Sequence, residues 1–141
     1  MKSAIACAVL VLLALSNLGA AQYTFDGNND GEPDQWFLAE GEIVLEMKMD
    51  RDYDGAVDYL ARFNDKKEIV YEEYDFNHDG GMDDFYYYDD EGLLVRQEID
   101  SNFDEKVDIW IFLYQGMYIK RYERDVDHDG RVDLVKDYGS E

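Results

Sequence analysis

The sequence contains almost no cysteine and almost no proline. Its 141 residues include one cysteine, Cys7, and one proline, Pro33. Cys7 lies in the N-terminal apolar stretch, so the rest of the chain has no cysteine. It cannot form disulfide bonds, even in a compartment that permits them. Any cross-link that stabilises the fold must therefore be of another kind than a disulfide.

Basic residues are also scarce. The chain has 13 Lys and Arg against 34 Asp and Glu, and only one basic residue, Lys2, precedes residue 22. Residues 22–141 thus carry 12 basic and 34 acidic side chains, a formal charge of −22. This charge disfavours a nucleic-acid partner, because phosphates would be repelled. Strong acidity is also typical of disordered chains, but 15% aromatic residues, 46% apolar residues and a single proline indicate a folded domain.

Only the N-terminus contains a long apolar run. Lys2 precedes the apolar residues 4–15, and the small residues 19–21 follow them. This pattern predicts a secretory signal peptide over residues 1–21, with cleavage after Ala20 or Ala21, because the run is too short for a membrane anchor. Cys7 lies too early for a lipoprotein signal. We therefore expect one domain over residues 22–141, without a transmembrane segment, in a secreted, periplasmic or cell-surface protein.

An acidic loop with the pattern D-x-[DN]-x-D-G-x-x-D occurs five times. We name the copies loop 1 (26–34), loop 2 (50–58), loop 3 (75–83), loop 4 (100–108) and loop 5 (125–133), and number their positions 1 to 9. Their first aspartates lie 24, 25, 25 and 25 residues apart, a period typical of repeat proteins. The predicted metal ligands, at positions 1, 3, 5 and 9, are Asp26, Asn28, Asp30, Asp34, Asp50, Asp52, Asp54, Asp58, Asp75, Asn77, Asp79, Asp83, Asp100, Asn102, Asp104, Asp108, Asp125, Asp127, Asp129 and Asp133.

The loop spacing suits calcium. Ca²⁺ takes six to eight oxygens at about 2.3–2.6 Å, and side chains at positions 1, 3 and 5 of a tight loop converge on one point. Glycine at position 6 permits a positive φ, and the aspartate at position 9 adds an oxygen. Asp, Asn and Gly also favour ordinary turns. However, two carboxylates about 4 Å apart repel by roughly 4 kcal/mol, so we expect bound Ca²⁺ and a loose or unfolded metal-free form.

The segments between the loops alternate like β-strands. Residues 59–63 and 69–73, 85–88 and 93–99, and 109–114 and 117–121 form pairs of β-branched and aromatic runs separated by tight polar turns. We predict an all-β fold: about five β-hairpin repeats of about 25 residues joined by calcium loops, in an open meander or solenoid-like sheet. The loops should lie at one edge and the tight turns at the other. Residues 109–114 are apolar on both faces, so we expect both to be covered, and residues 133–138 should cap the array. Five repeats are too few for a β-propeller.

The loops resemble those of thrombospondin type 3 repeats and of bacterial secreted calcium-loop repeat proteins. They also open like an EF-hand loop, but position 12 is Phe37, Ala61, Tyr86, Ile111 or Lys136 instead of a bidentate Glu, and the flanks are not helical. The resemblance covers the five loops, about a third of residues 22–141. It implies extracellular calcium binding with a structural role.

The five copies are not equivalent. Glu105 replaces the glycine of loop 4, so that loop should be strained or bind more weakly. Loops 2 and 5 have four aspartates and the glycine, and should bind best. Acids two residues before a loop (Glu73, Glu98, Glu123) are expected to be solvated strand-end groups, with a ligand role as the alternative. His78 and His128 at position 4 should point away from the metal into solvent.

No catalytic constellation accompanies the loops, so we do not expect an enzyme. Residues 22–141 have no Cys, both histidines lie in loops, and no acid pair stands outside the repeats. The predicted function is a secreted calcium-binding protein of structural or adhesion type, in which Ca²⁺ staples the repeats. The alternatives are a calcium-dependent carbohydrate-binding module, for which the aromatic residues 86–88, Trp36 and Trp110 would form a platform, or a low-affinity calcium store. Apart from calcium ions, candidate partners are a cell-surface protein or glycan.

Overall fold

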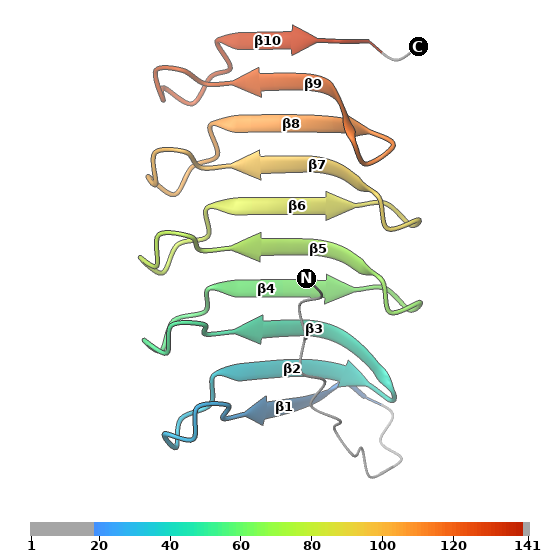
Figure 1. The fold of residues 1–141 in the computed structure, drawn as a ribbon, viewed down its shortest axis with the longest axis vertical. Helices are drawn as coiled ribbons and strands as arrows, with labels where there is room; N and C mark the ends of the chain where they lie inside the picture. The colour runs from blue at the N-terminus through green and yellow to red at the C-terminus, as the bar shows by residue number, and fades with distance from the viewer. Residues whose placement is uncertain (1–18, 140–141) are drawn as a thin grey trace, which may run out of the picture.

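The computed structural model describes residues 19–139, and these form ten antiparallel β-strands in one open sheet without a helix (Figure 1). Strand order follows the sequence, so the sheet is a meander. The strands are β1 (Ala21–Phe25), β2 (Gln35–Glu40), β3 (Ile43–Met49), β4 (Tyr59–Phe63), β5 (Ile69–Tyr74), β6 (Asp84–Tyr88), β7 (Leu94–Ile99), β8 (Ile109–Tyr114), β9 (Tyr118–Arg124) and β10 (Leu134–Asp137). The predicted all-β hairpin array is confirmed, as an open meander rather than a solenoid.

Two kinds of connection alternate along the chain. The five acidic loops connect β1 to β2, β3 to β4, β5 to β6, β7 to β8 and β9 to β10, and all lie at one end of the strands (Figure 1). Tight turns at the other end close four hairpins, β2–β3, β4–β5, β6–β7 and β8–β9. In the described sheet, β1 and β10 therefore stand as single strands at the two edges, each attached through a loop.

Each tight turn uses a residue with positive φ and is followed by a β-bulge in the second strand of its hairpin. In the β6–β7 hairpin, Gly92 has φ 75° and its N–H donates to the carbonyl of Asp89 at 3.0 Å. The register shifts between Tyr87 and Tyr88 in the same hairpin, and an equivalent shift occurs in the other three. Glycine reaches positive φ without the clash that Cβ causes, so three of the turn positions follow from a glycine in the sequence, whereas the β4–β5 turn places Lys67 at φ 66°.

The alternation of side chains along the strands gives the two faces different contents. On one face Arg62, Tyr71, Tyr87 and Arg96 are directly opposed on β4 to β7, and the guanidinium of Arg96 lies 3.9 Å from the centre of the Tyr87 ring. Arginine over a tyrosine ring is a favourable cation–π contact.

The opposite face holds a buried carboxylate among tyrosines. Glu72 accepts hydrogen bonds from the hydroxyls of Tyr59 and Tyr88, each at 2.6 Å, and from Tyr74 at 3.2 Å. Tyr88 therefore points to the face opposite Tyr87, and residues 86–88 do not form one aromatic platform. A period of two residues divides any run of three between two faces.

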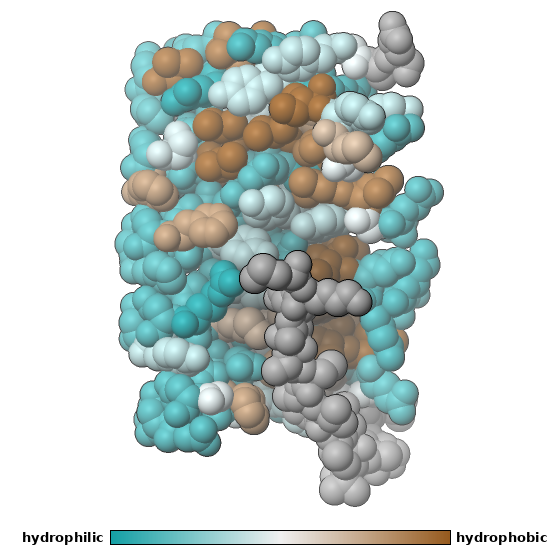
Figure 2. Space-filling view, viewed as in Figure 1, coloured by the Kyte–Doolittle hydropathy of each residue, from teal (hydrophilic) through white to brown (hydrophobic). Residues whose placement is uncertain are grey.

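The sheet has a single layer and consequently little apolar core. The buried apolar residues in the described chain are Ala39, Tyr59, Leu60 and Ala61, whereas ten acidic residues are buried. Residues of β8 from Ile109 to Leu113 are only half-buried and Tyr114 is exposed, so the expected coverage on both faces is wrong. No second layer of described structure packs against either face. Figure 2 shows the hydrophilic edge made by the acidic loops and the apolar residues gathered over the strands.

The N-terminal expectations fall mostly outside the described residues. Residues 1–18, with Cys7, belong to the predicted signal peptide and are not described, while Ala21 is already the first residue of β1. β10 pairs with β9 at the C-terminal edge, where the capping segment was predicted, but all its residues are exposed. Within residues 19–139 no helix is long and apolar enough to cross a membrane.

Candidate metal centre

The acidic loops form a column along one edge of the sheet, and backbone hydrogen bonds link each loop to the next. The N–H at position 1 of each later loop donates to the carbonyl at position 9 of the loop before it. These four bonds join Asp50 to Asp34, Asp75 to Asp58, Asp100 to Asp83 and Asp125 to Asp108, at 2.9, 2.9, 2.8 and 2.9 Å. All eight aspartates are buried. Asp26 and Asp133, the outer members at the two ends of the column, are not.

Carboxylates at positions 1 and 9 hold the loop conformation. In loop 3, Asp75 accepts the N–H of His78 at 2.7 Å and of Gly80 at 2.8 Å. Asp83 accepts the N–H of Phe76 at 2.8 Å. Loops 1, 2 and 5 repeat the bond from the glycine N–H to the position-1 carboxylate, at 2.9, 2.8 and 2.7 Å. The recurring sequence thus folds locally because the side-chain oxygens accept the free N–H groups of a tight turn.

Several predicted ligands converge. In loop 2, ligand oxygens of Asp50, Asp52 and Asp54 all lie within 4.8 Å of one another. In loop 5, Asp125, Asp127 and Asp133 meet the same limit. Three carboxylates this close repel one another strongly unless a cation lies among them.

One oxygen in the column lacks a hydrogen-bond partner. The Oδ1 atom of Asp34 is buried and accepts no hydrogen bond within the described structure. A buried carboxylate oxygen without a donor is costly, whereas coordination to a cation would satisfy it. The donor set, all oxygen and mostly carboxylate, fits a hard cation such as Ca²⁺.

Loops 1 and 3 use asparagine in place of one carboxylate. The amide of Asn28 donates to Asp30 and that of Asn77 donates to Asp79, each at 2.8 Å. The amide oxygens of Asn28 and Asn77 accept the N–H at position 5, again at 2.8 Å in both loops. Loops 1 and 3 therefore have one carboxylate fewer than loops 2 and 5, so fewer like charges repel one another within them.

Loop 4 departs from the pattern at its sixth position. Glu105 takes φ 66°, the left-handed region that glycine occupies in the other loops. The bond to Oδ2 of Asp100 comes from the N–H of Lys106 at 3.2 Å instead of from position 6. Ser101 adds a hydroxyl bond to Asp108 at 2.8 Å. Asn102 and Asp104 keep positions 3 and 5, so loop 4 has the predicted residues in a shifted hydrogen-bond arrangement.

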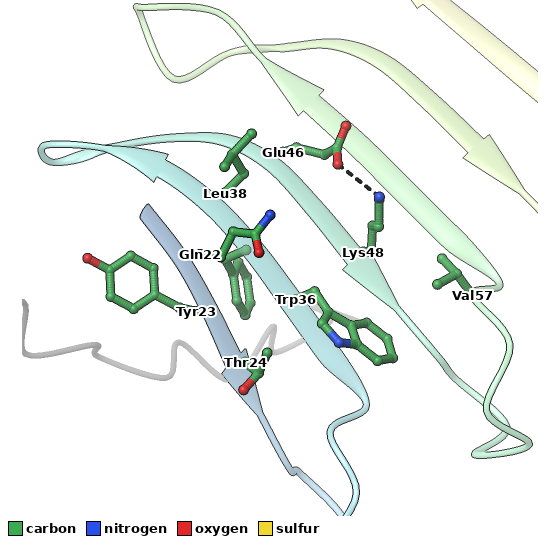
Figure 3. Close-up of a pocket in the computed structure, with 9 residues that line it drawn as sticks. Gln22, Tyr23, Thr24, Trp36, Leu38, Glu46, Lys48 and Val57 are labelled. Atoms are coloured by element: carbon green, nitrogen blue, oxygen red, sulfur yellow. Dashed lines mark ion pairs between the residues drawn. The ribbon is translucent and has the colours of Figure 1, made fainter. Parts of the chain in front are cut away.

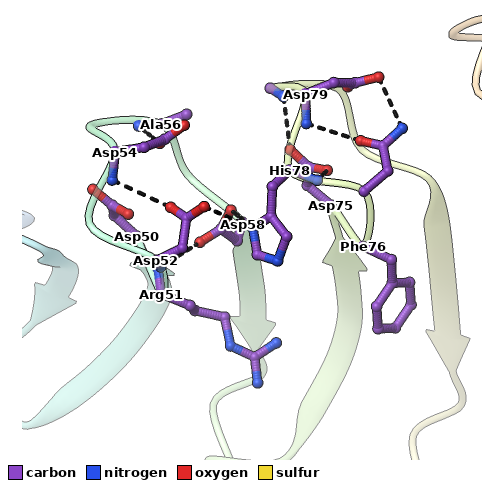
Figure 4. Close-up of polar contacts among 12 residues, drawn as sticks. Asp50, Arg51, Asp52, Asp54, Ala56, Asp58, Asp75, Phe76, His78 and Asp79 are labelled. Carbon is purple, nitrogen blue, oxygen red and sulfur yellow. Dashed lines mark hydrogen bonds and ion pairs between the residues drawn. The ribbon is translucent and has the colours of Figure 1, made fainter.

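The histidines at position 4 are exposed, as predicted, and each also contacts the preceding loop. Nδ1 of His78 lies 2.9 Å from Asp58 and 3.2 Å from Asp52, so these three residues form a further cluster with metal-ligating atoms (Figure 4). Nδ1 of His128 lies 3.3 Å from Asp108 in the same way. The constant offset of 20 residues between each pair is visible in the sequence, but only the sideways stacking of the loops makes it a contact.

The histidine changes the electrostatics of its partner. Burial opposes ionisation of Asp58, but the N–H of Arg51 and the His78 ring hold its pKa below the ordinary value. The hydrogen bond to Asp58 in turn raises the pKa of His78. At the equivalent Asp83, burial raises the pKa above the ordinary value, and the N–H of Phe76 offsets only part of it. Equivalent aspartates therefore differ in proton affinity according to the neighbouring loop.

The acids two residues before the loops belong to the sheet face. Glu73 accepts the hydroxyl of Tyr71 at 2.6 Å, and Glu98 accepts that of Tyr87 at 3.0 Å. Glu123 pairs with Arg121. They are part-buried partners of neighbouring strand residues, not the solvated acids that were expected, and they do not reach into the acidic loops.

A shallow hollow lies on the sheet face near the N-terminal edge and reaches loop 2 at Val57. It has a volume of about 290 Å³ and is lined by Trp36, Leu38, Val57 and the Lys48–Glu46 ion pair at 3.1 Å, among others (Figure 3). Trp36 lies on the same face as Lys48, which is its direct neighbour on β3. An aromatic ring beside paired charges could bind a polar ring-shaped ligand.

The sequence matches no protein-family model, and no curated protein matches it either.

Proposed function

We propose that this protein is a secreted calcium-binding repeat protein of structural or adhesion type, in which Ca²⁺ joins neighbouring repeats. The observation that carries the proposal is the convergence of Asp50, Asp52 and Asp54 within 4.8 Å, in a loop that recurs five times along one edge. Oxygen ligands at this spacing are those that Ca²⁺ uses in tight acidic loops.

The position of the carboxylates supports a structural role for the ions. Few apolar side chains are buried, so the single-layer sheet has a weak hydrophobic contribution to its folding. The buried acids of neighbouring loops lie next to one another, and Asp50 bonds to Asp34 through the backbone. Cations in this column would convert repulsion between loops into attraction. Extracellular modules bind calcium with dissociation constants of about 10⁻⁴–10⁻³ M, which suits a secreted protein.

The first experiment is a calorimetric titration of the chain, expressed from its full sequence, with CaCl₂, accompanied by far-UV circular dichroism in EDTA and in calcium. We expect four or five ions per chain and a transition from coil to strand. Absence of binding together with a β spectrum in EDTA would show that the loops are only hydrogen-bonded turns, and would overturn the proposal.

A pair of charge-matched variants tests the position of the sites. The double variant Asp52→Asn/Asp54→Asn removes two charges from loop 2, whereas Asp65→Asn/Asp90→Asn removes two from exposed residues at the tight-turn end. We expect the first to lose one bound ion and the second to keep the full number. Equal loss in both would mean that calcium responds to overall charge and not to the loops.

Carbohydrate binding is a second candidate, favoured by the hollow beside Trp36. Indole rings stack on the apolar faces of sugars, and Glu46 and Lys48 could supply hydrogen bonds. A glycan array probed in calcium, with Trp36→Ala as the comparison, tests it. Binding that disappears in Trp36→Ala supports a glycan site, and an array without signal removes this candidate.

A further inference from the structure

The two edges of the sheet are complementary halves of the same repeat. β1 precedes loop 1 as β3, β5, β7 and β9 precede their loops, while β10 follows loop 5 as the first strands of the four hairpins follow theirs. Every interior strand that follows a loop is paired on its far side with a strand that precedes one. At β10 and β1 this pairing is missing within the described chain. We infer that β10 of one molecule pairs with β1 of a second copy, so that the chain assembles head to tail.

The backbone groups needed for this pairing face outward. The N–H of Tyr138 donates to the carbonyl of Lys120 at 2.9 Å, so the even-numbered residues of this segment bond to β9. Because residues of an antiparallel strand alternate between their two neighbours, Val135 and Asp137 present N–H and C=O to the outside. β1 pairs with β2 in the same register in which β9 pairs with β10. The backbone N–H and C=O groups of Gln22 and Thr24 therefore face outward at the other edge.

The interior hairpins give the register of the junction. In the β8–β9 hairpin, Trp110 opposes Glu123 and Phe112 opposes Arg121. Moving this pattern one repeat onward places Val135 opposite Thr24 and Asp137 opposite Gln22 of the second copy. In the same register, Leu134 would lie opposite Phe25 and Lys136 would lie opposite Tyr23. No pair joins like charges, and Leu134 and Phe25 are apolar side chains that are 36% and 43% exposed in the single molecule.

The column of loops would continue across the same junction. Four bonds already join position 1 of one loop to position 9 of the loop before it. The remaining ends of this series are the N–H of Asp26 and the C=O of Asp133. A second copy would bring them together as a fifth bond and would bury both side chains, as the eight interior aspartates are buried.

The N-terminal edge also lacks the features that normally prevent strand addition. Natural sheets protect their edges with charges, proline or bulges. β1 contains no charged residue and no proline, and its five pairs with β2 show no register shift. Since the two contacting surfaces differ, the association is heterologous, and successive copies add to one another as a filament, or as a ring if the rotation between copies closes.

The test uses two variants that each block one edge. Val135→Pro removes an outward N–H from β10, and Thr24→Pro removes one from β1, in both cases without removing a bond inside the molecule. In millimolar calcium at near-physiological salt, light scattering with size-exclusion chromatography should show a wild-type mass that rises with concentration. Each variant alone should be a monomer, and a mixture should form a 1:1 dimer, because each supplies the edge that the other lacks.

A crosslinking measurement keeps the inference testable if a proline variant does not fold. In a Cys7→Ser background, Tyr23→Cys/Lys136→Cys places thiols on a pair without mutual backbone hydrogen bonds, where Cα atoms of paired strands lie about 4.5 Å apart, within disulfide range. Mild oxidation should give a ladder of covalent oligomers, whereas either single variant has no partner thiol at the junction and should give no ladder.

Assembly rests partly on the proposed calcium binding, because molecules of high negative charge repel one another. Calorimetry and circular dichroism on the same samples separate the two proposals. A wild-type chain that binds calcium and is folded, yet stays monomeric and gives no ladder, overturns head-to-tail assembly alone. Failure to bind calcium overturns the proposed function. Proline variants that assemble like the wild type show that another surface is used and also overturn the inference.

Discussion

At the scale of single residues, the left-handed region of the backbone recurs twice in every loop. Position 4 has φ between 59° and 66° in all five copies, and position 6 has φ between 88° and 100° in the four that contain glycine. Added Cβ atoms at Gly31, Gly55, Gly80 and Gly130 would meet nothing within 4 Å. The requirement for glycine there is thus one of backbone conformation and not of space.

Glu105 is the exception, and replacing it should relieve strain. The left-handed conformation costs a residue with a Cβ atom roughly 1–2 kcal/mol, and glycine avoids this cost. Glycine also gives the unfolded chain more conformational freedom, which cancels part of the gain in stability. We predict that Glu105→Gly raises the free energy of unfolding by about 1 kcal/mol. Urea denaturation in calcium measures this change.

The reverse substitution in an intact loop provides the control. Gly55→Ala adds a Cβ at φ 95° without a steric contact, so it should destabilise the protein by about 1 kcal/mol. If Glu105→Gly and Gly55→Ala both lower stability, position 6 does not impose the same backbone requirement on the two loops.

At the scale of strands, hydroxyl–carboxylate pairs take the place of much of the missing core. Tyr71 donates to Glu73, Tyr86 to Asp84 and Tyr88 to Glu72, at 2.6, 2.8 and 2.6 Å. Burial, reinforced by the neighbouring carboxylate, raises the pKa of each of these three phenols well above its ordinary value. Each pair is stable only while the phenol keeps its proton.

The pKa shifts predict a loss of stability at alkaline pH. A phenol whose folded pKa exceeds the unfolded value of about 10 contributes fully below that pH and loses its contribution as pH rises through the folded pKa. The check is a pH titration that follows tyrosine ionisation by absorbance near 295 nm and the β-sheet signal by circular dichroism. The paired tyrosines should ionise only as the β-sheet signal in circular dichroism disappears. A single ionisation phase near pH 10 with the sheet intact would contradict this.

At the scale of the whole molecule, a single-layer meander makes each strand depend on its two neighbours. The buried apolar residues Tyr59, Leu60 and Ala61 lie in β4, whereas every residue of β10 is exposed. Stability in such arrays is a sum of local terms, so opening should begin at the ends. We predict that amide hydrogens of β4 and β5 exchange more slowly than those of β10 in dilute protein. Uniform exchange along the sheet would indicate all-or-none opening.

Net charge also acts on the molecule as a whole. Five Ca²⁺ ions would reduce the formal charge of residues 22–141 from −22 to −12. Sodium chloride at about 1 M shortens the Debye length to about 3 Å, so it screens repulsion between loops but supplies no coordination. We predict that salt in EDTA restores only part of the melting temperature reached in millimolar calcium. Equal melting temperatures in EDTA with salt and in calcium would show that screening alone suffices.

Most of the architecture could be predicted from local patterns. Alternating β-branched and aromatic runs predicted the strands, and Asp- and Gly-rich segments predicted both kinds of turn, because these signals act within a few residues. The contact of His78 with Asp58 and the half-buried state of β8 could not be predicted, since they depend on what lies beside each repeat. The apolar sequence pattern of a strand such as residues 109–114 is the same whether or not a second layer covers the strand.

The sequence by itself determined the period, the strand segments and the acidic residues of each loop, because backbone geometry and turn chemistry are local. Only the tertiary structure decided that the repeats form an open meander and that residues 86–88 divide between two faces. It also decided that the aspartates at positions 1 and 9 are buried where neighbouring loops meet, with Asp26 and Asp133 left out at the ends. These features depend on the pairing of each strand with its neighbours, which is a property of the assembled sheet and not of any single repeat.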